Sequence, residues 1–116
     1  MLTVIIVDDD QDIRRGISSL MRSLGHDVRV FGSAEECLAS TARADCAIVD
    51  IALPGVNGLE LHSRLRTEGR GIPVVFVTAH DDVALMAEVQ RTGQPLLKKP
   101  LDEGVLLDAI SRALAG

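Results

Sequence analysis

Carboxylates stand at the ends of two apolar stretches of the sequence. Asp8, Asp9 and Asp10 follow the run LTVIIV at residues 2–7, and Asp50 follows the run CAIV at residues 46–49. Two like charges about 4 Å apart repel by about 4 kcal/mol at an effective dielectric constant of about 20, so a cluster of these groups needs a counter-charge. A divalent cation with oxygen ligands meets that need, and Mg²⁺ combines a few carboxylates with water.

A hydroxyl and an ammonium group follow two further apolar stretches. Thr78 comes after the run IPVVFV at residues 72–77, and Lys98, Lys99 and Pro100 come after two leucines. A threonine at a strand end is usually a turn residue, and a pair of lysines is usually solvated. Their placement beside the carboxylates is what indicates phosphoryl transfer, which needs positioning and charge neutralisation.

The chemistry assigns each group a role. A carboxylate is the nucleophile of aspartyl-phosphate chemistry. We therefore predict Asp50 as the nucleophile, Asp8 and Asp9 as metal ligands, and Thr78 and Lys99 as contacts of the phosphoryl oxygens. The simpler interpretation of the first acidic run is that it caps a helix, because acids suit the positive end of the helix dipole. We assign that capping role to Asp10 or Asp12, which leaves Asp50 unexplained by capping.

The segments that must position these groups alternate between strand and helix patterns. Short apolar runs predict strands, and apolar residues at helical spacing predict helices. Strands are expected at residues 2–7, 28–31, 46–49, 72–77 and 96–97, each followed by a helix. Gly25 and Gly93 are expected to end the first and fourth helices. Ser33 and Glu36 form a capping box for the second helix, which is expected to run to about residue 42.

Five such units predict an α/β fold, a doubly wound five-stranded parallel sheet with helices on both faces. Fold analogy with flavodoxin-like proteins gives the strand order 2-1-3-4-5 and places the site where strands 1 and 3 diverge. The length of 116 residues fits one domain over residues 1–116. In the first helix Arg14, Arg15, Ser18 and Arg22 are expected on the outer face.

Composition excludes several classes of function. The net charge of −5 disfavours nucleic-acid binding and docking on an anionic membrane. No apolar run reaches the roughly 18 residues of a membrane span, and no basic segment precedes an apolar stretch at the N-terminus, so we expect no signal peptide. The spacing of Cys37 and Cys46 fits neither a redox motif nor a zinc site, which predicts buried thiols in a reducing cytoplasm.

Four motifs carry a family resemblance: IIVDDD at 5–10, VDIALPGVNGLEL at 49–61, VVFVTAH at 74–80 and KKP at 98–100. With them the sequence resembles, over its whole length, the receiver domain of two-component response regulators. The resemblance implies that Asp50 is the phospho-acceptor, that Thr78 is the switch hydroxyl and that Lys99 pairs with the phosphoryl group. It also implies a Mg²⁺ site formed by Asp8, Asp9, Asp50 and the backbone carbonyl of Ala52, with Ala52 and His80 flanking the phosphoryl group. The Lys99–Pro100 peptide is expected to be cis.

The resemblance also implies a signalling function in the cytoplasm. A sensor histidine kinase would donate the phosphoryl group, and the domain would catalyse its own phosphorylation and dephosphorylation without being an enzyme for another substrate. The motifs resemble receivers that precede a helix-turn-helix DNA-binding domain, so a transcriptional output domain or partner protein is expected. Its contact face would be the fourth helix, fifth strand and fifth helix, which could also form a phosphorylation-dependent homodimer.

Two departures from the family pattern concern that face. Leu96 stands where the family usually has an aromatic residue, and the segment from Gly93 to Lys99 is one residue shorter than usual. Leu107 and Leu114 lie beside the core stripe of the last helix, where they would contact a partner or complete the core. The readout of phosphorylation is therefore expected to depart from the usual route.

Three other interpretations are weaker. A flavodoxin-like cofactor binder would need a phosphate-binding loop where the three aspartates stand, and they would repel a phosphate. An aspartyl phosphatase would need a second acid at the position of Ala52. A phosphorylation-independent receiver-like protein-binding module is the remaining alternative, and the complete set of functional residues disfavours it.

Overall fold

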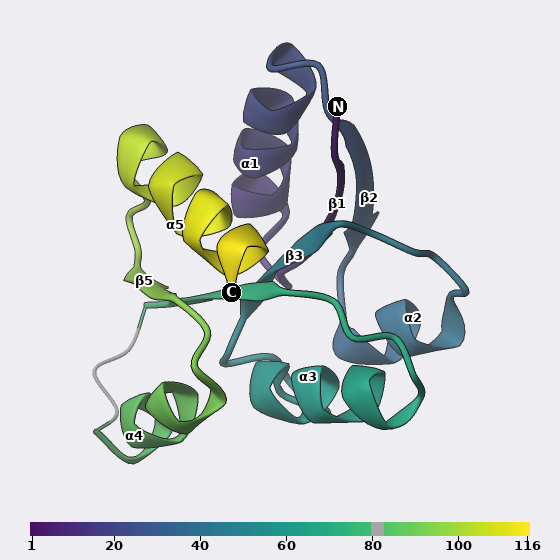
Figure 1. The fold of residues 1–116 in the computed structure, drawn as a ribbon, viewed down its shortest axis with the longest axis vertical. Helices are drawn as coiled ribbons and strands as arrows, with labels where there is room; N and C mark the ends of the chain where they lie inside the picture. Colours follow the sequence, from purple (N-terminus) through teal and green to yellow (C-terminus); the bar gives the residue numbers. More distant parts are fainter. Residues whose placement is uncertain (80–82) are drawn as a thin grey trace.

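The computed structural model of the chain describes residues 1–79 and 83–116 and contains five βα units (Figure 1). The strands are β1 (Thr3–Val7), β2 (Asp27–Phe31), β3 (Cys46–Asp50), β4 (Val74–Thr78) and β5 (Leu96–Lys98). The helices are α1 (Gln11–Ser23), α2 (Ala34–Ala39), α3 (Gly58–Thr67), α4 (Val83–Thr92) and α5 (Glu103–Ala115). All strand pairs are parallel and the order is β2-β1-β3-β4-β5, which confirms the predicted fold class and topology.

The sheet separates two layers of helices. Successive side chains of a strand point to opposite faces, and β1 shows this clearly: Val4 and Ile6 pack with α1 and α5, whereas Ile5 and Val7 pack with α2, α3 and α4. Figure 1 shows α1 and α5 together on one side of the sheet and the other three helices on the other. The three central strands β1, β3 and β4 are therefore buried on both faces, as their apolar runs indicate.

Local signals set most helix ends as expected. Gly25 and Gly93 have φ angles of 88° and 75°, the left-handed conformation that glycine adopts readily after a helix. The Oγ of Ser33 accepts a hydrogen bond from the N–H of Glu36, as the capping box requires. The side chain of Glu36 accepts a hydrogen bond from the N–H of Gly32. In a standard capping box it would accept from the N–H of the N-cap residue, Ser33.

The second helix is shorter than predicted. It ends at Ala39 instead of about residue 42, because Ser40 is extended with ψ 151° and its Oγ accepts a hydrogen bond from the N–H of Ala42. The guanidinium of Arg70 donates to the carbonyls of Leu38 and Ser40, so these end carbonyls have partners without a further helical turn. This stop depends on an arginine thirty residues away in sequence and cannot be found from local pattern alone.

The predicted start of the fourth strand and the predicted exposure of Ser18 are wrong, and the two open positions of the last helix divide between core and surface. The fourth strand begins at Val74 rather than at residue 72, since Ile72 and Pro73 precede its ladder. Ser18 is buried, 4% exposed, although the helical pattern placed it on the outer face of α1. Leu107 packs partly against the core of the α1 and α5 layer, while Leu114 is 41% exposed.

The two cysteines are free and buried, as predicted. Burial raises the pKa of Cys46 to about 11 and also raises the pKa of Cys37, so both thiols stay protonated and pack as small apolar groups. The structure also confirms the cis peptide between Lys99 and Pro100. None of the helices in the described parts of the chain has the length and apolar character needed to cross a bilayer.

Candidate functional site

The candidate site lies at the carboxyl edge of the sheet, where four strands end side by side. Parallel strands all end at one edge, and the register aligns Val7 with Val49, Asp50 with Val77 and Thr78 with Lys98. Residues at or just after the ends of β1, β3, β4 and β5 therefore meet there. The predicted acidic, hydroxyl and ammonium groups are brought to one place by topology.

Three of the aspartates form a tight cluster. One carboxylate oxygen from each of Asp8, Asp9 and Asp50 lies within 4.8 Å of the others. Asp8 and Asp50 are buried, 1% and 5% exposed, whereas Asp9 is exposed. Two carboxylates that have lost most of their solvent thus face each other, and the third closes the cluster on the solvent side.

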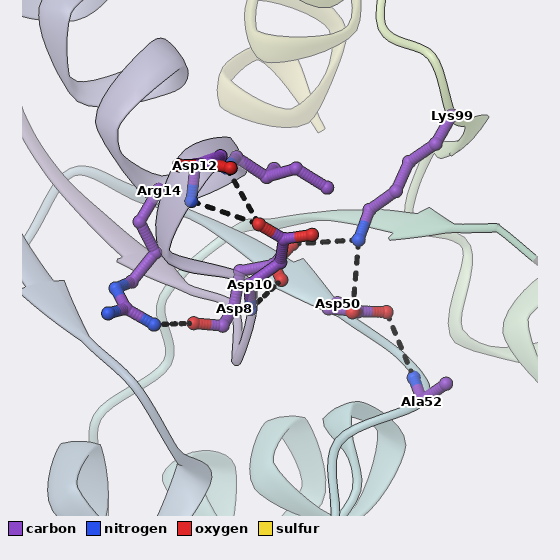
Figure 2. A network of polar contacts seen from close by, with 8 residues as sticks. Asp8, Asp10, Asp12, Arg14, Asp50, Ala52 and Lys99 are labelled. Atoms are coloured by element: carbon purple, nitrogen blue, oxygen red, sulfur yellow. Dashed lines mark hydrogen bonds and ion pairs between the residues drawn. The ribbon is translucent and has the colours of Figure 1, made fainter.

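Lys99 supplies the counter-charge. Its Nζ lies 2.9 Å from Oδ2 of Asp8 and donates a hydrogen bond of 3.1 Å to Oδ2 of Asp50 (Figure 2). Its side chain is 12% exposed. The backbone N–H of Lys99 donates to the carbonyl of Thr78 at 2.8 Å, which fixes the start of the segment after β5 against the end of β4. A single ammonium group therefore bridges both buried carboxylates.

The carboxylate of Asp50 is oriented from two sides. Oδ2 accepts from Lys99, and Oδ1 accepts from the backbone N–H of Ala52 at 3.0 Å (Figure 2). Gly58 at the start of α3 lies close against the backbone of Asp50. A Cβ on Gly58 would lie 2.5 Å from the carbonyl oxygen of Asp50. The sequence motif thus needs glycine at this position for close backbone approach.

Neighbouring residues of the first acidic run have different structural roles. Asp10 is the N-cap of α1, with Oδ1 accepting from the N–H groups of Asp12 and Ile13. The N–H of Asp10 donates to Oδ1 of Asp8 at 2.9 Å, and a guanidinium N–H of Arg14 donates to the backbone carbonyl of Asp8 at 2.7 Å. Capping by Asp10 is therefore confirmed, and Asp8 is held in place by the same helix (Figure 2).

Burial and polar contacts act in opposite directions on the pKa values of Asp8 and Lys99. Burial raises the pKa of the Asp8 carboxyl, and the nearby charge of Asp50 adds to that rise, although the ion pair with Lys99 and the hydrogen bond from the Asp10 N–H oppose it. Burial alone would lower the pKa of Lys99, but its contacts with Asp8, an ion pair, and with Asp50, a hydrogen bond, outweigh burial and raise it. Lys99 therefore remains charged at neutral pH.

The donor set fits a hard divalent cation. Oδ2 of Asp8 is buried and accepts no well-directed hydrogen bond, because Nζ of Lys99 approaches it as an ion pair off the hydrogen-bonding direction. That oxygen keeps acceptor capacity beside two further carboxylates. Mg²⁺ takes all-oxygen ligands and keeps several waters, which suits a cluster with one exposed carboxylate.

The other residues predicted for the site or for its readout lie on or near β3, β4 and β5, apart from one that the structure does not describe. Thr78 is buried, 3% exposed, at the end of β4. Ala52 is exposed directly after β3, and its contact with Asp50 is made by its N–H. His80 lies outside the described residues. Leu96 pairs with Phe76 in the sheet and packs partly against the core of the α3 and α4 layer.

Two contributions were not foreseen from the sequence. Arg14 was placed on a solvated face, but its guanidinium reaches the carbonyl of Asp8. His62 is buried, 7% exposed, and its ring makes an edge-on contact with Phe76 at a centroid distance of 5.6 Å. For His62 the signal was available, because it lies three residues before Leu65 and so on the buried face of α3.

Comparison with known proteins gives consistent matches over nearly the whole chain. The family model described as response regulator receiver domain matches residues 4–111. Among curated proteins, nodulation protein W of Bradyrhizobium diazoefficiens is 37% identical over 113 residues, covering 95% of this chain and 50% of that protein. Transcriptional regulatory protein TdiR of Thauera aromatica is 34% identical over 116 residues, covering 97% and 51%. The chain thus spans about half the length of these relatives.

Solved structures give the same picture. The response regulator StyR superimposes with a TM-score of 0.86 at 38% identity, covering 97% of this chain and 59% of that one. The structure named FixJ-N superimposes with a TM-score of 0.88 at 30% identity, covering 99% and 94%. The similarity therefore extends over the sheet, all five helices and the edge that carries the acidic cluster.

Proposed function

The chain belongs to the response regulator receiver domain family of two-component systems, and from that membership we propose that Asp50 accepts a phosphoryl group from a sensor histidine kinase. Residues 1–116 act in this proposal as one receiver domain in a phosphorelay. The domain supplies its own catalytic groups for phosphorylation and dephosphorylation and is not an enzyme for a separate substrate.

The observation that carries the proposal is the bridge from Lys99 to the two buried carboxylates. Nζ of Lys99 contacts Oδ2 of Asp8 at 2.9 Å and Oδ2 of Asp50 at 3.1 Å. A carboxylate held between an ammonium and an acidic cluster is presented as a nucleophile, and a dianionic phosphoryl group on it would be neutralised by the same ammonium. Thr78, buried at the neighbouring strand end, is the proposed hydroxyl contact of the phosphoryl oxygens.

Mg²⁺ is the proposed cofactor. Asp8, Asp9, Asp50 and the backbone carbonyl of Ala52 would hold it, and the metal would supply charge neutralisation for the incoming phosphoryl group. Two observations support this assignment. Oδ2 of Asp8 is buried without a hydrogen-bond partner, and three carboxylate oxygens lie within 4.8 Å of one another. His80 stays a prediction as a neighbour of the phosphoryl group.

The proposed output is transcriptional, in the cytoplasm. Relatives named as transcriptional regulators are about twice as long as this chain, which supports a further output domain or a partner protein that does the DNA binding. The proposed contact face is α4, β5 and α5, where Val83, Val105 and Leu114 are exposed apolar residues. The same face is the proposed surface of a phosphorylation-dependent homodimer.

Intact mass spectrometry after incubation with Mg²⁺ and acetyl phosphate tests the proposal. The wild-type chain should gain about 80 Da, the mass of one phosphoryl group, and the gain should require Mg²⁺. The Asp50→Ala variant should gain nothing, whereas Asp108→Ala, an exposed acid of α5, should label as the wild type does. Absence of any gain while a known receiver is labelled would favour the phosphorylation-independent binding module instead.

A further inference from the structure

A polar cleft lies along α1 and the edge strand β2. Its volume is about 340 Å³, and α1 contributes Gln11, Arg14, Arg15, Ser18, Ser19 and Arg22 to its wall. These positions recur at intervals of three and four residues, so they form one face of the helix. Val30 of the edge strand β2, 44% exposed, completes the wall.

The charge of this cleft is opposite to that of the protein. The chain carries a net charge of −5, but three of its arginines line this one cleft and no carboxylate does so among the described residues. Within residues 1–79 and 83–116, Arg15 and Arg22 make no ion pair, whereas Arg29, Arg64, Arg70 and Arg112 each do. The positive charge of the cleft is therefore available to a ligand.

A buried hydroxyl adds a second, independent feature. Ser18 is 4% exposed, its Oγ has no hydrogen-bond partner, and it lines the cleft between the arginines. Buried polar groups in proteins are almost always hydrogen-bonded, so an unpartnered hydroxyl needs an explanation. In a helix such a serine can also bond to the carbonyl four residues earlier, and Ser18 does not.

We propose that this cleft binds a small molecule that carries a phosphate or diphosphate group. Arginine guanidinium groups donate paired hydrogen bonds to phosphate oxygens, and a serine hydroxyl completes such sites. The volume lies at the lower end of the range for small-molecule sites. The site is separate from the proposed phosphorylation site, since its walls are α1 and β2 rather than the ends of β3, β4 and β5.

The cleft and the acidic cluster share one residue. Arg14 lines the cleft, and its guanidinium also donates to the backbone carbonyl of Asp8 at 2.7 Å (Figure 2). A bound phosphate group would compete with that carbonyl for the guanidinium. Occupancy of the cleft would thus weaken the hydrogen bond that the backbone carbonyl of Asp8 accepts from Arg14.

Titration of the ¹⁵N-labelled chain with inorganic pyrophosphate tests the proposal, followed by amide chemical shifts in metal-free buffer. Saturable shifts are expected in α1 and around Val30, and the Arg15→Gln/Arg22→Gln variant should bind about tenfold more weakly or worse, because each lost contact is a charge-assisted hydrogen bond. The Ser18→Ala variant should also weaken binding. The amide spectrum of each variant reports whether it is folded.

The matched control is Arg66→Gln/Arg91→Gln, which removes two arginines from a different polar pocket between α3 and α4. It should bind pyrophosphate as the wild type does. Shifts that sodium chloride reproduces at equal ionic strength would overturn the proposal. So would shifts confined to the ends of β3, β4 and β5, or an equal loss of binding in the control variant.

Discussion

Lys99 is the residue on which the electrostatics of the site depend. It is the cation in contact with both Asp8 and Asp50, two carboxylates that are almost fully buried. Breaking a buried ion pair by removing one partner leaves an uncompensated charge, which is far more costly than losing an exposed pair. The stability of the metal-free protein should therefore depend strongly on this side chain.

The Lys99→Met variant tests this dependence. Without the ammonium group the two carboxylates repel each other in a desolvated site, and we expect the free energy of unfolding to fall by about 3 kcal/mol without metal. Urea denaturation at neutral pH measures it. The matched control is Lys98→Met, an exposed neighbour, for which a change within about 0.5 kcal/mol is expected. Equal losses in the two variants would contradict the bridging role.

His62 should leave a signature in the pH dependence of stability. Burial, and to a lesser extent Arg66, lowers the pKa of His62 below its ordinary value of 6.5. Below pH 6.5 the unfolded chain therefore binds a proton that the folded chain does not, and stability falls as the pH drops from 6.5 through the lowered pKa. Above 6.5 both states are neutral and this contribution is constant.

The measurement is the free energy of unfolding from pH 4 to 8 for the wild type and for His62→Gln. The difference between the two profiles should change below pH 6.5 and be flat above it. Ser63→Ala, an exposed neighbour of His62 on α3 without a titratable group, serves as the control and should keep the wild-type slope below pH 6.5. A flat difference over the whole range for His62→Gln would show that the ring titrates alike in both states.

At the scale of elements, the start of α3 and the end of β3 are fitted to each other. A Cβ on Gly58 would lie 2.5 Å from the carbonyl oxygen of Asp50 and 2.9 Å from Cα of Ile51, both backbone atoms that cannot rotate away. Gly16, in the exposed middle of α1, has nothing within 4 Å of its Cβ position. The same substitution should therefore have opposite effects in the two helices.

We expect Gly58→Ala to lose about 2 kcal/mol of stability and to slow phosphorylation of Asp50, because the helix must shift the strand end that carries the nucleophile. Gly16→Ala should gain about 0.5–1 kcal/mol through helix propensity. Thermal unfolding and labelling with acetyl phosphate measure both effects. A neutral Gly58→Ala variant would mean that α3 does not position Asp50.

The sequence predicts the end of a helix when a local signal sets it, but not when a contact distant in the sequence sets it. The strands and helices follow from apolar periodicity, and Gly25 and Gly93 mark helix ends by local chemistry. The end of α2 was predicted too late, because Arg70 caps its carbonyls from a distant loop. Ser18 was predicted on the outer face but is buried, because apolar periodicity does not show which polar positions of a helix the fold covers.

The candidate site was predictable for a different reason. Its residues lie at strand ends, and a parallel sheet brings such ends together at one edge. The cluster of Asp8, Asp9 and Asp50 and its contact with Lys99 follow from that topology. The bond from Arg14 to the Asp8 carbonyl does not, since it depends on a long side chain that folds back along α1.

At the scale of the whole molecule, metal binding should stabilise the fold. Cations that bind the folded chain and not the unfolded one add about 2.7 kcal/mol at a hundred times their dissociation constant. We expect Mg²⁺ to raise the unfolding midpoint of the wild type. Asp9→Asn should abolish this gain with little loss of stability in metal-free buffer, because Asp9 is exposed.

Scanning calorimetry with and without MgCl₂ measures the gain, with NaCl at matched ionic strength as the salt control. Asp108→Asn, which removes one exposed acid of α5 far from the cluster, should keep the full response. A Mg²⁺ response that survives in Asp9→Asn would place the cation elsewhere on this acidic protein.

Asp50, rather than another acid of the cluster, is expected to carry the phosphoryl group. Reduction of the acetyl-phosphate-labelled chain with borohydride converts an aspartyl phosphate into homoserine, and peptide mass spectrometry then locates the converted residue. Homoserine is expected at position 50 alone, and only when Mg²⁺ was present during labelling. Conversion at Asp8 or Asp9, or labelling that is independent of Mg²⁺, would contradict it.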